Sequence, residues 1–398
     1  MNLTASAQAT LLLTSYFSSA KTNEHKPLTN AEWGKFALWL KHQRISPAGL
    51  LVPDPQSLLG GWNDSRIPLE RLLGLLGRGH SLALAVEKWQ RAGLWIITRA
   101  DAGYPQRLKD SLRNDSPPVL FGCGNQALLQ SGGTAIIGSR NAVEEDLAFT
   151  EQLARKLASE GGNVVSGGAR GIDECAMLAA LNAGGTATGV LTDSLLKAST
   201  SAKWRSGLAS GNLVLISPFY PEAGFSVANA MARNKYVYCL AESAVVVHAG
   251  TKGGTVTGAL EALKNRWVPV WVKPNQDQNS ANAMLVQNGA AWCAEQAESI
   301  ERKALKRRTE NVGFSQPGLF SLQEAPAEYA VDTQRGTVDF YQVFLEEIQR
   351  LALQPVAKET LADILQLTPE QLQVWLNRAV NDNRLRQLPD SGLYQIPD

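Results

Sequence analysis

Residues 163–173, Asn-Val-Val-Ser-Gly-Gly-Ala-Arg-Gly-Ile-Asp, combine residue types that suit the binding of a phosphate group. The apolar pair Val164–Val165 ends at a Ser-Gly-Gly turn, and a helical pattern follows. Backbone N–H groups at a helix N-terminus favour an anion, Arg170 adds a positive charge, and Asp173 adds an acceptor on the first helical turn. The stretch predicts a phosphate-bearing ligand, either a nucleotide or a nucleic-acid backbone. Its candidate binding residues are Ser166, Gly167, Gly168, Arg170, Gly171 and Asp173.

Three further segments share this chemistry, and each brings Arg or Lys. They are 138–140 (Gly-Ser-Arg), 233–235 (Arg-Asn-Lys) and 251–255 (Thr-Lys-Gly-Gly-Thr). We expect all four segments to be loops that fall just after strands, so that their N–H groups and charges converge on one edge of a sheet and form a polyanion site. The additional candidate residues are Gly138, Ser139, Arg140, Arg233, Asn234, Lys235, Lys252, Gly253, Gly254 and Thr255.

Each charged candidate also has a structural interpretation. Arg140 and Arg170 either contact phosphate, which suits the planar guanidinium fork, or form a salt bridge that closes their loop. The position of Asp173 favours capping or orienting Arg170 over catalysis. Lys235 and Lys252 either contact a ligand backbone or are solvated loop lysines.

Catalytic residues are harder to find in this sequence. Glu261 is a weak candidate for a general acid or base, and a pair with Lys264 or Arg266 is the more common role for such a helical Glu. The aromatic residues near the basic segments either stack on bases or belong to the core. These aromatic residues are Trp204, Phe219, Tyr220 and Phe225.

The elements that must position these residues alternate along the middle of the chain. Continuous apolar runs separated by helical patterns predict an α/β fold, with a Rossmann-like parallel sheet covered by helices on both faces. In such sheets ligands bind at the carboxyl ends of the strands. The runs are 135–137, 164–165, 189–191, 213–216, 244–247 and 268–272, within a domain expected at 95–308.

Two smaller regions flank this domain. Residues 1–94 read as a helical domain, in which Gly74-x-x-Gly77-x-Gly79 fits either a helix-hairpin-helix turn or a helix C-cap. Residues 309–337 read as a linker. Residues 338–398 show three helical patterns and a hairpin, which is typical of a winged helix. Nine acidic residues there outnumber five basic ones, which favours a protein partner or a regulatory role over DNA.

The composition argues against several classes of protein, namely membrane-spanning, secreted and metal-binding ones. The 398 residues contain no apolar run long enough to span a membrane and no secretory leader pattern. The four cysteines form no C-x-x-C pair and there are four histidines, so we expect no metal site and reduced thiols in the cytoplasm. No ribose-binding pattern follows Leu191-Thr-Asp193, so no dinucleotide cofactor is expected.

Several of these segments resemble the DNA-processing protein DprA (Smf) family. The resemblance is carried by Ile137-Gly-Ser-Arg140, Val165-Ser-Gly-Gly-Ala-Arg-Gly-Ile-Asp173 and the Arg233-Asn234 pair, with support from Tyr104-Pro105 and Pro117-Pro118-Val-Leu-Phe121. It covers about residues 70–300. It implies a cytoplasmic homodimer that is not an enzyme, binds single-stranded DNA and hands it to a RecA-type recombinase in natural transformation, recombination or genome defence.

The sequence also departs from that family's pattern. Met177 stands where the family usually carries histidine. The segment Lys252–Glu261 is similar to the Gly-Gly-x-Gly-Thr-x-x-Glu loop of the related nucleotide phosphoribohydrolases of the LOG family. This similarity implies a divergent member of the wider superfamily. It leaves a nucleotide sensor or a nucleoside-monophosphate phosphoribohydrolase as the alternative.

Overall fold

The computed structural model describes residues 3–17, 25–275, 277 and 279–306, and near the C-terminus residues 345, 348–349, 351–352, 354–365, 369–388 and 393–397. The chain divides into two compact units, Met1–Ser315 and Gln316–Asp398. The expected linker at 309–337, the Thr368 position and the turn at 389–392 lie outside the described residues. In the part of the chain that the structure describes, no helix is long and apolar enough to cross a membrane.

The first unit begins with helices that pack around an aromatic core. Thr29 and Glu32 cap the second helix reciprocally through their side chains and backbone N–H groups. Phe36 lies against Trp39 and Trp62 in this core. The elements are α1 (Ala5–Thr14), α2 (Asn30–His42), η2 (Pro47–Leu50), η3 (Ser57–Leu59), α3 (Leu69–Leu76) and α4 (Gly79–Arg91).

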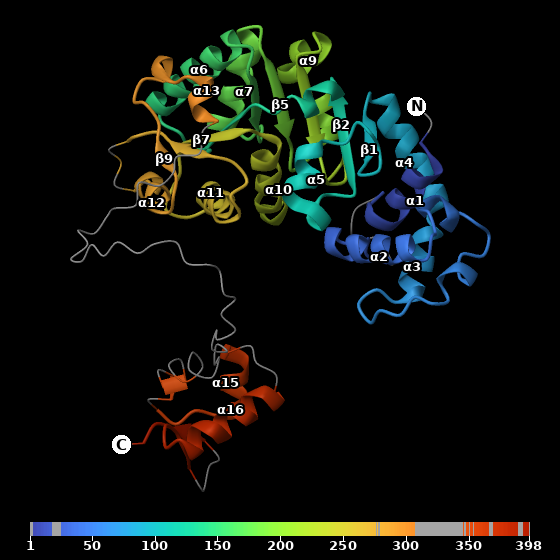
Figure 1. Ribbon diagram of the computed structural model, residues 1–398, viewed down its shortest axis with the longest axis vertical. Helices are drawn as coiled ribbons and strands as arrows, with labels where there is room; N and C mark the ends of the chain where they lie inside the picture. The colour runs from blue at the N-terminus through green and yellow to red at the C-terminus, as the bar shows by residue number, and fades with distance from the viewer. Residues whose placement is uncertain are drawn as a thin grey trace, which may run out of the picture. The chain divides into compact units, whose positions relative to one another are not determined.

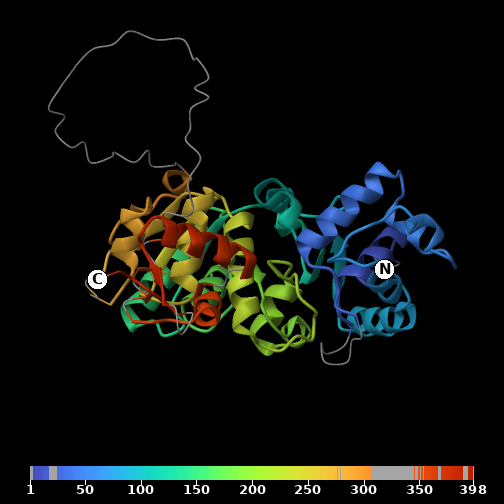
Figure 2. The same cartoon turned by 90° about the horizontal axis from the view of Figure 1, so that it is seen from below.

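A nine-stranded sheet follows, in the order β1-β2-β6-β5-β4-β3-β7-β8-β9. Neighbours from β6 to β9 pair in parallel, whereas β2 pairs with both β1 and β6 in antiparallel register. Figures 1 and 2 place the N-terminal helices beside β1 and β2, at one end of the sheet. The strands are β1 (Trp95–Thr98), β2 (Val119–Gly124), β3 (Thr134–Gly138), β4 (Asn163–Ser166), β5 (Thr186–Val190), β6 (Leu213–Ser217), β7 (Ser243–His248), β8 (Val270–Val272) and β9 (Ala291–Trp292).

Helices cover both faces of this sheet (Figure 1). Successive strand residues point to opposite faces, so Ala135 and Ile137 pack in the cluster beside α10 and α11, while Ile136 packs beside α6 and α7. The helices are α5 (Gln106–Leu112), η4 (Arg113–Asp115), η5 (Gln126–Gln130), α6 (Glu144–Ser159), α7 (Ile172–Asn182), α8 (Leu195–Ser199), α9 (Ala202–Ala209), α10 (Val227–Leu240), α11 (Gly254–Asn265), α12 (Asn282–Gln287), η6 (Ala297–Ser299) and α13 (Arg302–Leu305).

The sequence-based fold prediction is confirmed in outline, and one detail differs. Each of the six apolar runs contains or overlaps one of the strands β3 to β8. The prediction that residues 233–235 form a loop after a strand is wrong, because they lie inside α10. Ser226 caps that helix by accepting a hydrogen bond from the backbone N–H of Asn229, and Arg233, Val237 and Leu240 are all buried in it. The helical spacing of the buried residues in α10 therefore determines the local structure, although the polar Arg-Asn-Lys sequence suggested a loop.

The second unit has a small core of its own. Leu345 and Ile348 pack with Leu361, Leu376 and other apolar residues. Its described regular elements are α15 (Lys358–Leu365), α16 (Pro369–Asn381) and the antiparallel pair β10 (Arg386–Gln387) and β11 (Tyr394–Gln395).

Candidate anion-binding site

The candidate site lies where the order of strands reverses. From the central strand β3 the chain continues to β4 on one side and returns to β7 on the other. Loops that leave the carboxyl ends of β3 and β7 diverge at this point, and such a crevice is where open α/β sheets bind ligands. A pocket of about 350 Å³ opens here. It is lined by Ile137, Gly138, Ser139, Arg140, Ala169, Asp173, Phe225, Val227, Ala230, Met231, Arg233, Asn234, Gly250, Lys252, Gly253, Gly254 and Thr255.

A buried pair of opposite charges forms one wall of this pocket. Nη1 of Arg233 lies 3.7 Å from Oδ2 of Asp173, and each residue is 5% exposed. The guanidinium packs on Gly167, where a Cβ would overlap it. Nε of Arg233 is buried and finds no hydrogen-bond partner among the described residues. A buried unpaired N–H is costly, and the guanidinium of Arg233 also lines the pocket, where it can donate to an anion.

Burial dominates the electrostatics of this pair. Desolvation raises the pKa of Asp173, and the positive charge of Arg233 opposes that effect. Desolvation lowers the pKa of Arg233, Asp173 opposes it, and the nearby charge of Arg140 lowers it further. A phosphate between Arg140 and Arg233 would relieve the repulsion between the two guanidinium groups.

The rim of the pocket is both cationic and apolar. The guanidinium of Arg140 lies over the ring of Phe225, 4.7 Å from its centroid. Phe225 is nevertheless 51% exposed, and Val227 and Met231 beside it on α10 are also exposed. Lys252 is exposed on the opposite loop. The rim therefore offers positive charge next to apolar surface.

Glycine-rich turns bring two helix N-termini to this edge. Gly171 and Gly253 directly precede α7 and α11, with φ of +92° and +115°, a region that favours glycine. A Cβ on Gly171 would lie 2.5 Å from the carbonyl oxygen of Ser139, so glycine lets the two loops touch. The side-chain amide of Asn234 donates to the Gly254 carbonyl (2.8 Å), and the Thr255 hydroxyl donates to the Gly138 carbonyl (3.3 Å). These bonds tie α10, α11 and β3 together.

Seven predicted residues are absent from the pocket lining, namely Gly167, Gly168 and Gly171 of the loop after β4 and four whose side chains have other roles. Ser166 is fully buried and donates to the Ile136 carbonyl at 2.6 Å, so its role is within the sheet. Arg170 is exposed and donates to Oδ1 of Asn141 at 3.2 Å. Lys235 lies over the ring of Tyr236. Glu261, two turns into α11, is absent from the pocket lining.

The expected role of Asp173 also changes. Its carboxylate faces Arg233 and accepts a weak hydrogen bond from the Gly138 N–H at 3.4 Å, instead of orienting Arg170. The reason is local. Arg170 precedes the helix and points to solvent, whereas Asp173 sits on the inward side of the first turn of α7.

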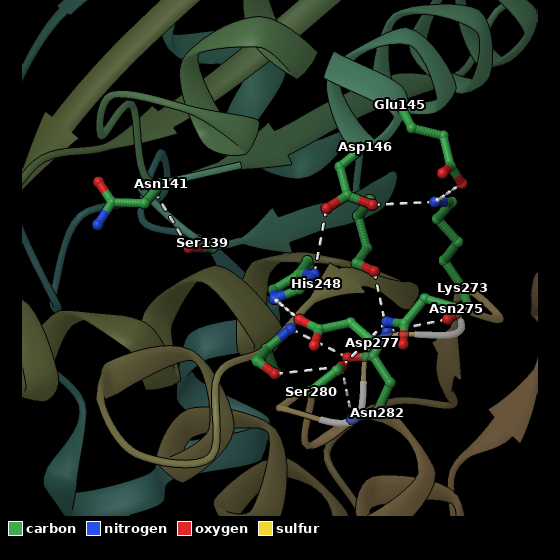
Figure 3. A network of polar contacts seen from close by, with 12 residues as sticks. Ser139, Asn141, Glu145, Asp146, His248, Lys273, Asn275, Asp277, Ser280 and Asn282 are labelled. Atoms are coloured by element: carbon green, nitrogen blue, oxygen red, sulfur yellow. Dashed lines mark hydrogen bonds and ion pairs between the residues drawn. The ribbon is translucent and has the colours of Figure 1, made fainter. Parts of the chain in front are cut away.

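A polar network beside the pocket, shown in Figure 3, was not predicted from the sequence. His248 ends β7, and its Nδ1 lies 3.1 Å from Oδ2 of Asp146 in the first turn of α6. Lys273, directly after β8, donates to Asp146 (2.9 Å) and Glu145 (2.7 Å). Burial disfavours the charged lysine, yet these carboxylates raise the pKa of Lys273 overall. One sequence signal was available, because a polar residue stands at the carboxyl end of each of these buried strands.

Asn282 completes the network from the start of α12. It is fully buried, and its side chain donates to the carbonyls of Val247 and Lys273 and accepts from the N–H of Ala249, each at 2.9 Å. It therefore fastens the ends of β7 and β8 and the start of the loop that carries Lys252.

Comparison with known proteins assigns the family. Residues 95–304 match the family described as DNA recombination-mediator protein A. This stretch is more than half of the chain and contains the whole pocket. The chain belongs to this family.

Individual relatives agree with this assignment. The chain is similar to the DNA processing protein DprA of Bacillus subtilis, with 28% identity over 186 residues, which is 44% of this chain and 59% of that protein. It is 28% identical to the protein Smf of Escherichia coli over 244 residues, 60% of this chain and 61% of that protein. The chain thus matches about three fifths of the length of these two relatives. The crystal structure of DprA from Streptococcus pneumoniae shares the fold, with a TM-score of 0.56 at 22% identity, covering 75% of this chain and 97% of that one.

Proposed function

We propose that this member of the DprA family binds single-stranded DNA through its phosphate backbone at the switch-point pocket and delivers it to a RecA-type recombinase. The observation that carries the proposal is Arg233, a buried guanidinium that lines the pocket with its Nε unpaired among the described residues. A phosphate in the pocket would pair with this guanidinium, and the N-terminus of α11 favours the same anion. Contacts of this kind are independent of base sequence.

The apolar rim favours a single strand over a duplex. Phe225 is half-exposed beside Arg140, so a base next to a bound phosphate can stack on its ring. Bases in a duplex are already stacked and paired, and would not reach a flat ring at the rim. Phosphate contacts together with stacking describe sequence-tolerant binding of single strands.

Binding of a labelled oligothymidine, followed by fluorescence anisotropy over a range of salt concentrations, tests this function. We expect the logarithm of the affinity to fall linearly with the logarithm of salt concentration, and a duplex of equal length to compete poorly. Arg140→Ala and Phe225→Ala should each weaken binding, whereas Arg155→Ala, which removes an exposed side chain paired with Glu151 on α6, should not. A folded protein that binds no oligonucleotide, or binds it without salt dependence, would contradict the proposal.

The partner and assembly proposals rest on the family assignment. A RecA-type recombinase would receive the strand, the chain would act as a homodimer in the cytoplasm, and it would perform no chemical step itself. Mixing the loaded strand with the recombinase and a single-strand-coating protein tests delivery, because a mediator shortens the lag before the recombinase hydrolyses ATP. An unchanged lag with a strand-binding protein would restrict the function to binding.

The second unit is proposed to be a winged helix that contacts protein. Its helices α15 and α16 and the β10–β11 pair suit this architecture. The excess of acidic residues in 338–398 opposes phosphate contact. Removing this segment should leave oligonucleotide affinity within about twofold while weakening a partner interaction.

A free nucleotide remains the second candidate ligand, favoured by the pocket volume of about 350 Å³, which suits one nucleotide. Among the described residues that line the pocket, Asp173 is the one carboxylate, and it faces Arg233. The arrangement therefore favours sensing of a nucleotide over hydrolysis of its glycosidic bond. Thermal-shift measurements with nucleoside monophosphates test sensing, and analysis of released base tests hydrolysis.

A further inference from the structure

We propose that a second hollow of the first unit docks a short acidic peptide that carries a large apolar side chain. This hollow, the α4–α8 groove, lies between residues 84–92, in and just after α4, and residues 196–200, in and just after α8. Its volume is about 550 Å³, and it shares no lining residue with the switch-point pocket. The groove therefore adds a protein-docking surface to the proposed function and does not depend on it.

The floor of the groove is aliphatic. Leu84 is 56% exposed. Leu196 and Ala92 are partly buried and pack against the hydrophobic cluster that joins the N-terminal helices to the sheet. An incoming apolar side chain would cover the exposed part of this surface, and removing apolar area from water is favourable. The packed cluster beneath gives that side chain a firm surface to lie on.

The rim of the groove carries more positive than negative charge. Lys88 and Arg91 come from the last turn of α4 and Lys197 from α8, whereas Glu87 is the one acidic residue among the described residues of the lining. Lys88 pairs with Glu222 and Arg91 with Glu87, yet the two basic side chains remain 57% and 78% exposed. Exposed pairs of this kind contribute little and can exchange partners. The exposed ammonium of Lys197 has no ion-pair partner in the part of the chain that the structure describes, so it is available to a carboxylate.

One loop, residues 218–226, holds both walls of the groove in place. Glu222 of this loop accepts a hydrogen bond from Nε1 of the buried Trp89 at 3.3 Å, which fastens α4. The backbone N–H of Leu196 donates to the carbonyl of Pro221 at 3.0 Å, which fastens α8. The groove is therefore formed before any partner arrives, and a preformed surface lowers the ordering cost of binding.

The lining favours a peptide over a nucleic-acid strand. None of the described residues that line the groove is aromatic, and strands bound without sequence preference rely on aromatic side chains for stacking. The switch-point pocket differs in this respect, because Phe225 lies at its rim beneath Arg140. An aliphatic floor beside ammonium and guanidinium groups instead matches an apolar anchor flanked by carboxylates.

Two panels of fluorescein-labelled heptapeptides test the proposal with the full chain. In the first panel Asp or Glu alternates with Leu, Ile or Phe, and the matched panel carries Lys in place of every acidic residue. We expect acidic peptides to bind with dissociation constants below about 100 μM in anisotropy titrations, and their lysine counterparts to bind at least about tenfold more weakly. Absence of binding across the acidic panel, or equal binding of the two panels, would overturn the proposal.

Two substitutions of exposed side chains locate the peptide. Lys197→Glu reverses the unpaired charge, and Leu84→Gln removes the exposed apolar surface. The matched controls are Lys264→Glu, at an exposed lysine in the last turn of α11, and Leu38→Gln, at a 50% exposed leucine of α2. We expect each groove variant to bind the tightest acidic peptide at least about fivefold more weakly, and each control to stay within about twofold of the wild-type protein. Groove variants that bind like their controls would show that the peptide lies elsewhere, and the proposal would fail.

Oligothymidine distinguishes this proposal from the proposed function. Lys197→Glu and Lys264→Glu change the net charge equally, so they should bind oligothymidine alike at physiological salt, where exposed charges more than about 8 Å apart are largely screened. Peptide binding by a protein that binds no oligothymidine would refute the proposed function and leave the groove assignment standing. A loss of oligothymidine affinity in Lys197→Glu alone, with peptide affinity kept, would assign the groove to nucleic acid and overturn the inference.

Discussion

The guanidinium of Arg233, in the middle of α10, rests directly on the backbone of Gly167, the first residue of the loop after β4. Even a methyl group on Gly167 would overlap the guanidinium. This contact explains why a glycine follows β4 although the turn at Gly168, with φ of +64°, is where positive φ is needed.

Gly167→Ala should therefore displace Arg233 and damage the anion site. We expect a loss of oligonucleotide affinity of at least about tenfold, together with destabilisation of about 1–3 kcal/mol from overpacking. Gly224→Ala is the matched control, because no heavy atom lies within 4 Å of its added Cβ. Anisotropy titrations and urea unfolding measure the two effects. If Gly167→Ala bound oligonucleotide as tightly as Gly224→Ala does, Arg233 would not be part of the binding site.

Asp173→Asn should separate stability from binding. Removing the carboxylate leaves the buried charge of Arg233 unpaired, which costs about 3–5 kcal/mol in such settings. The unpaired guanidinium then has a greater need for phosphate. Oligonucleotide should therefore raise the melting temperature of this variant more than that of the wild-type protein in a thermal-shift assay. A smaller ligand-induced shift than in the wild-type protein would show that Asp173 supports the ligand directly.

The salt dependence of binding should identify which cations touch phosphate. Arg140 and Lys252 line the pocket, so Arg140→Ala and Lys252→Ala should each reduce the magnitude of the log–log salt slope by about one. Arg170 is exposed and hydrogen-bonded to Asn141, so Arg170→Ala should leave the slope unchanged. A reduced slope for Arg170→Ala would mean that the loop rearranges on binding.

Arg71 should matter for folding and not for ligand. Its guanidinium pairs with both Glu32 oxygens and donates to the carbonyls of Lys26, Arg66 and Pro27. Arg71→Ala should cost about 2–3 kcal/mol in the free energy of unfolding and leave oligonucleotide affinity unchanged. Arg91→Ala removes a mostly exposed pair with Glu87 and should cost less than about 1 kcal/mol.

The same pair gives a pH prediction for stability. Burial opposes the charged form of Glu32, but its hydrogen bonds from Arg71 and the N–H of Thr29 lower its pKa overall. A lowered folded-state pKa contributes stability above the unfolded value near 4.5, and this contribution is lost as pH falls through the folded value. Acid unfolding measured by circular dichroism should therefore show a smaller loss of stability between neutral and acidic pH in Arg71→Ala than in the wild-type protein.

Much of the sheet was predictable because its parallel strands are buried on both faces and read as continuous apolar runs. The antiparallel pairing of β2 with β6 was not, because the order of strands in the sheet sets it and no local pattern does. The two residues of β9 are too few to give any periodic signal. Local sequence carries no information on either feature.

The glycine loops of the site were predictable from local motifs, whereas its charge pairing was not. The pair of Asp173 with Arg233 joins α7 to α10, which are far apart in the chain, and the motif pointed instead to Arg170 as the neighbour of Asp173. His248, Asp146 and Lys273 lie on separate elements far apart in the chain. Only the strand order brings them together.

One hydrophobic cluster has a consequence for cooperativity. Leu11 and Leu12 of α1 and Trp89 of α4 share this cluster with Phe121 of β2 and Leu215 of β6. Trp89 lies edge-on to Phe121, with ring centroids 5.1 Å apart. The N-terminal helices α1 and α4 therefore cover the apolar face at one end of the sheet. We expect these helices and the sheet to unfold in a single transition. A fragment that began at residue 95 would leave that apolar face open to water and prone to self-association, so the smallest well-behaved fragment must include α1.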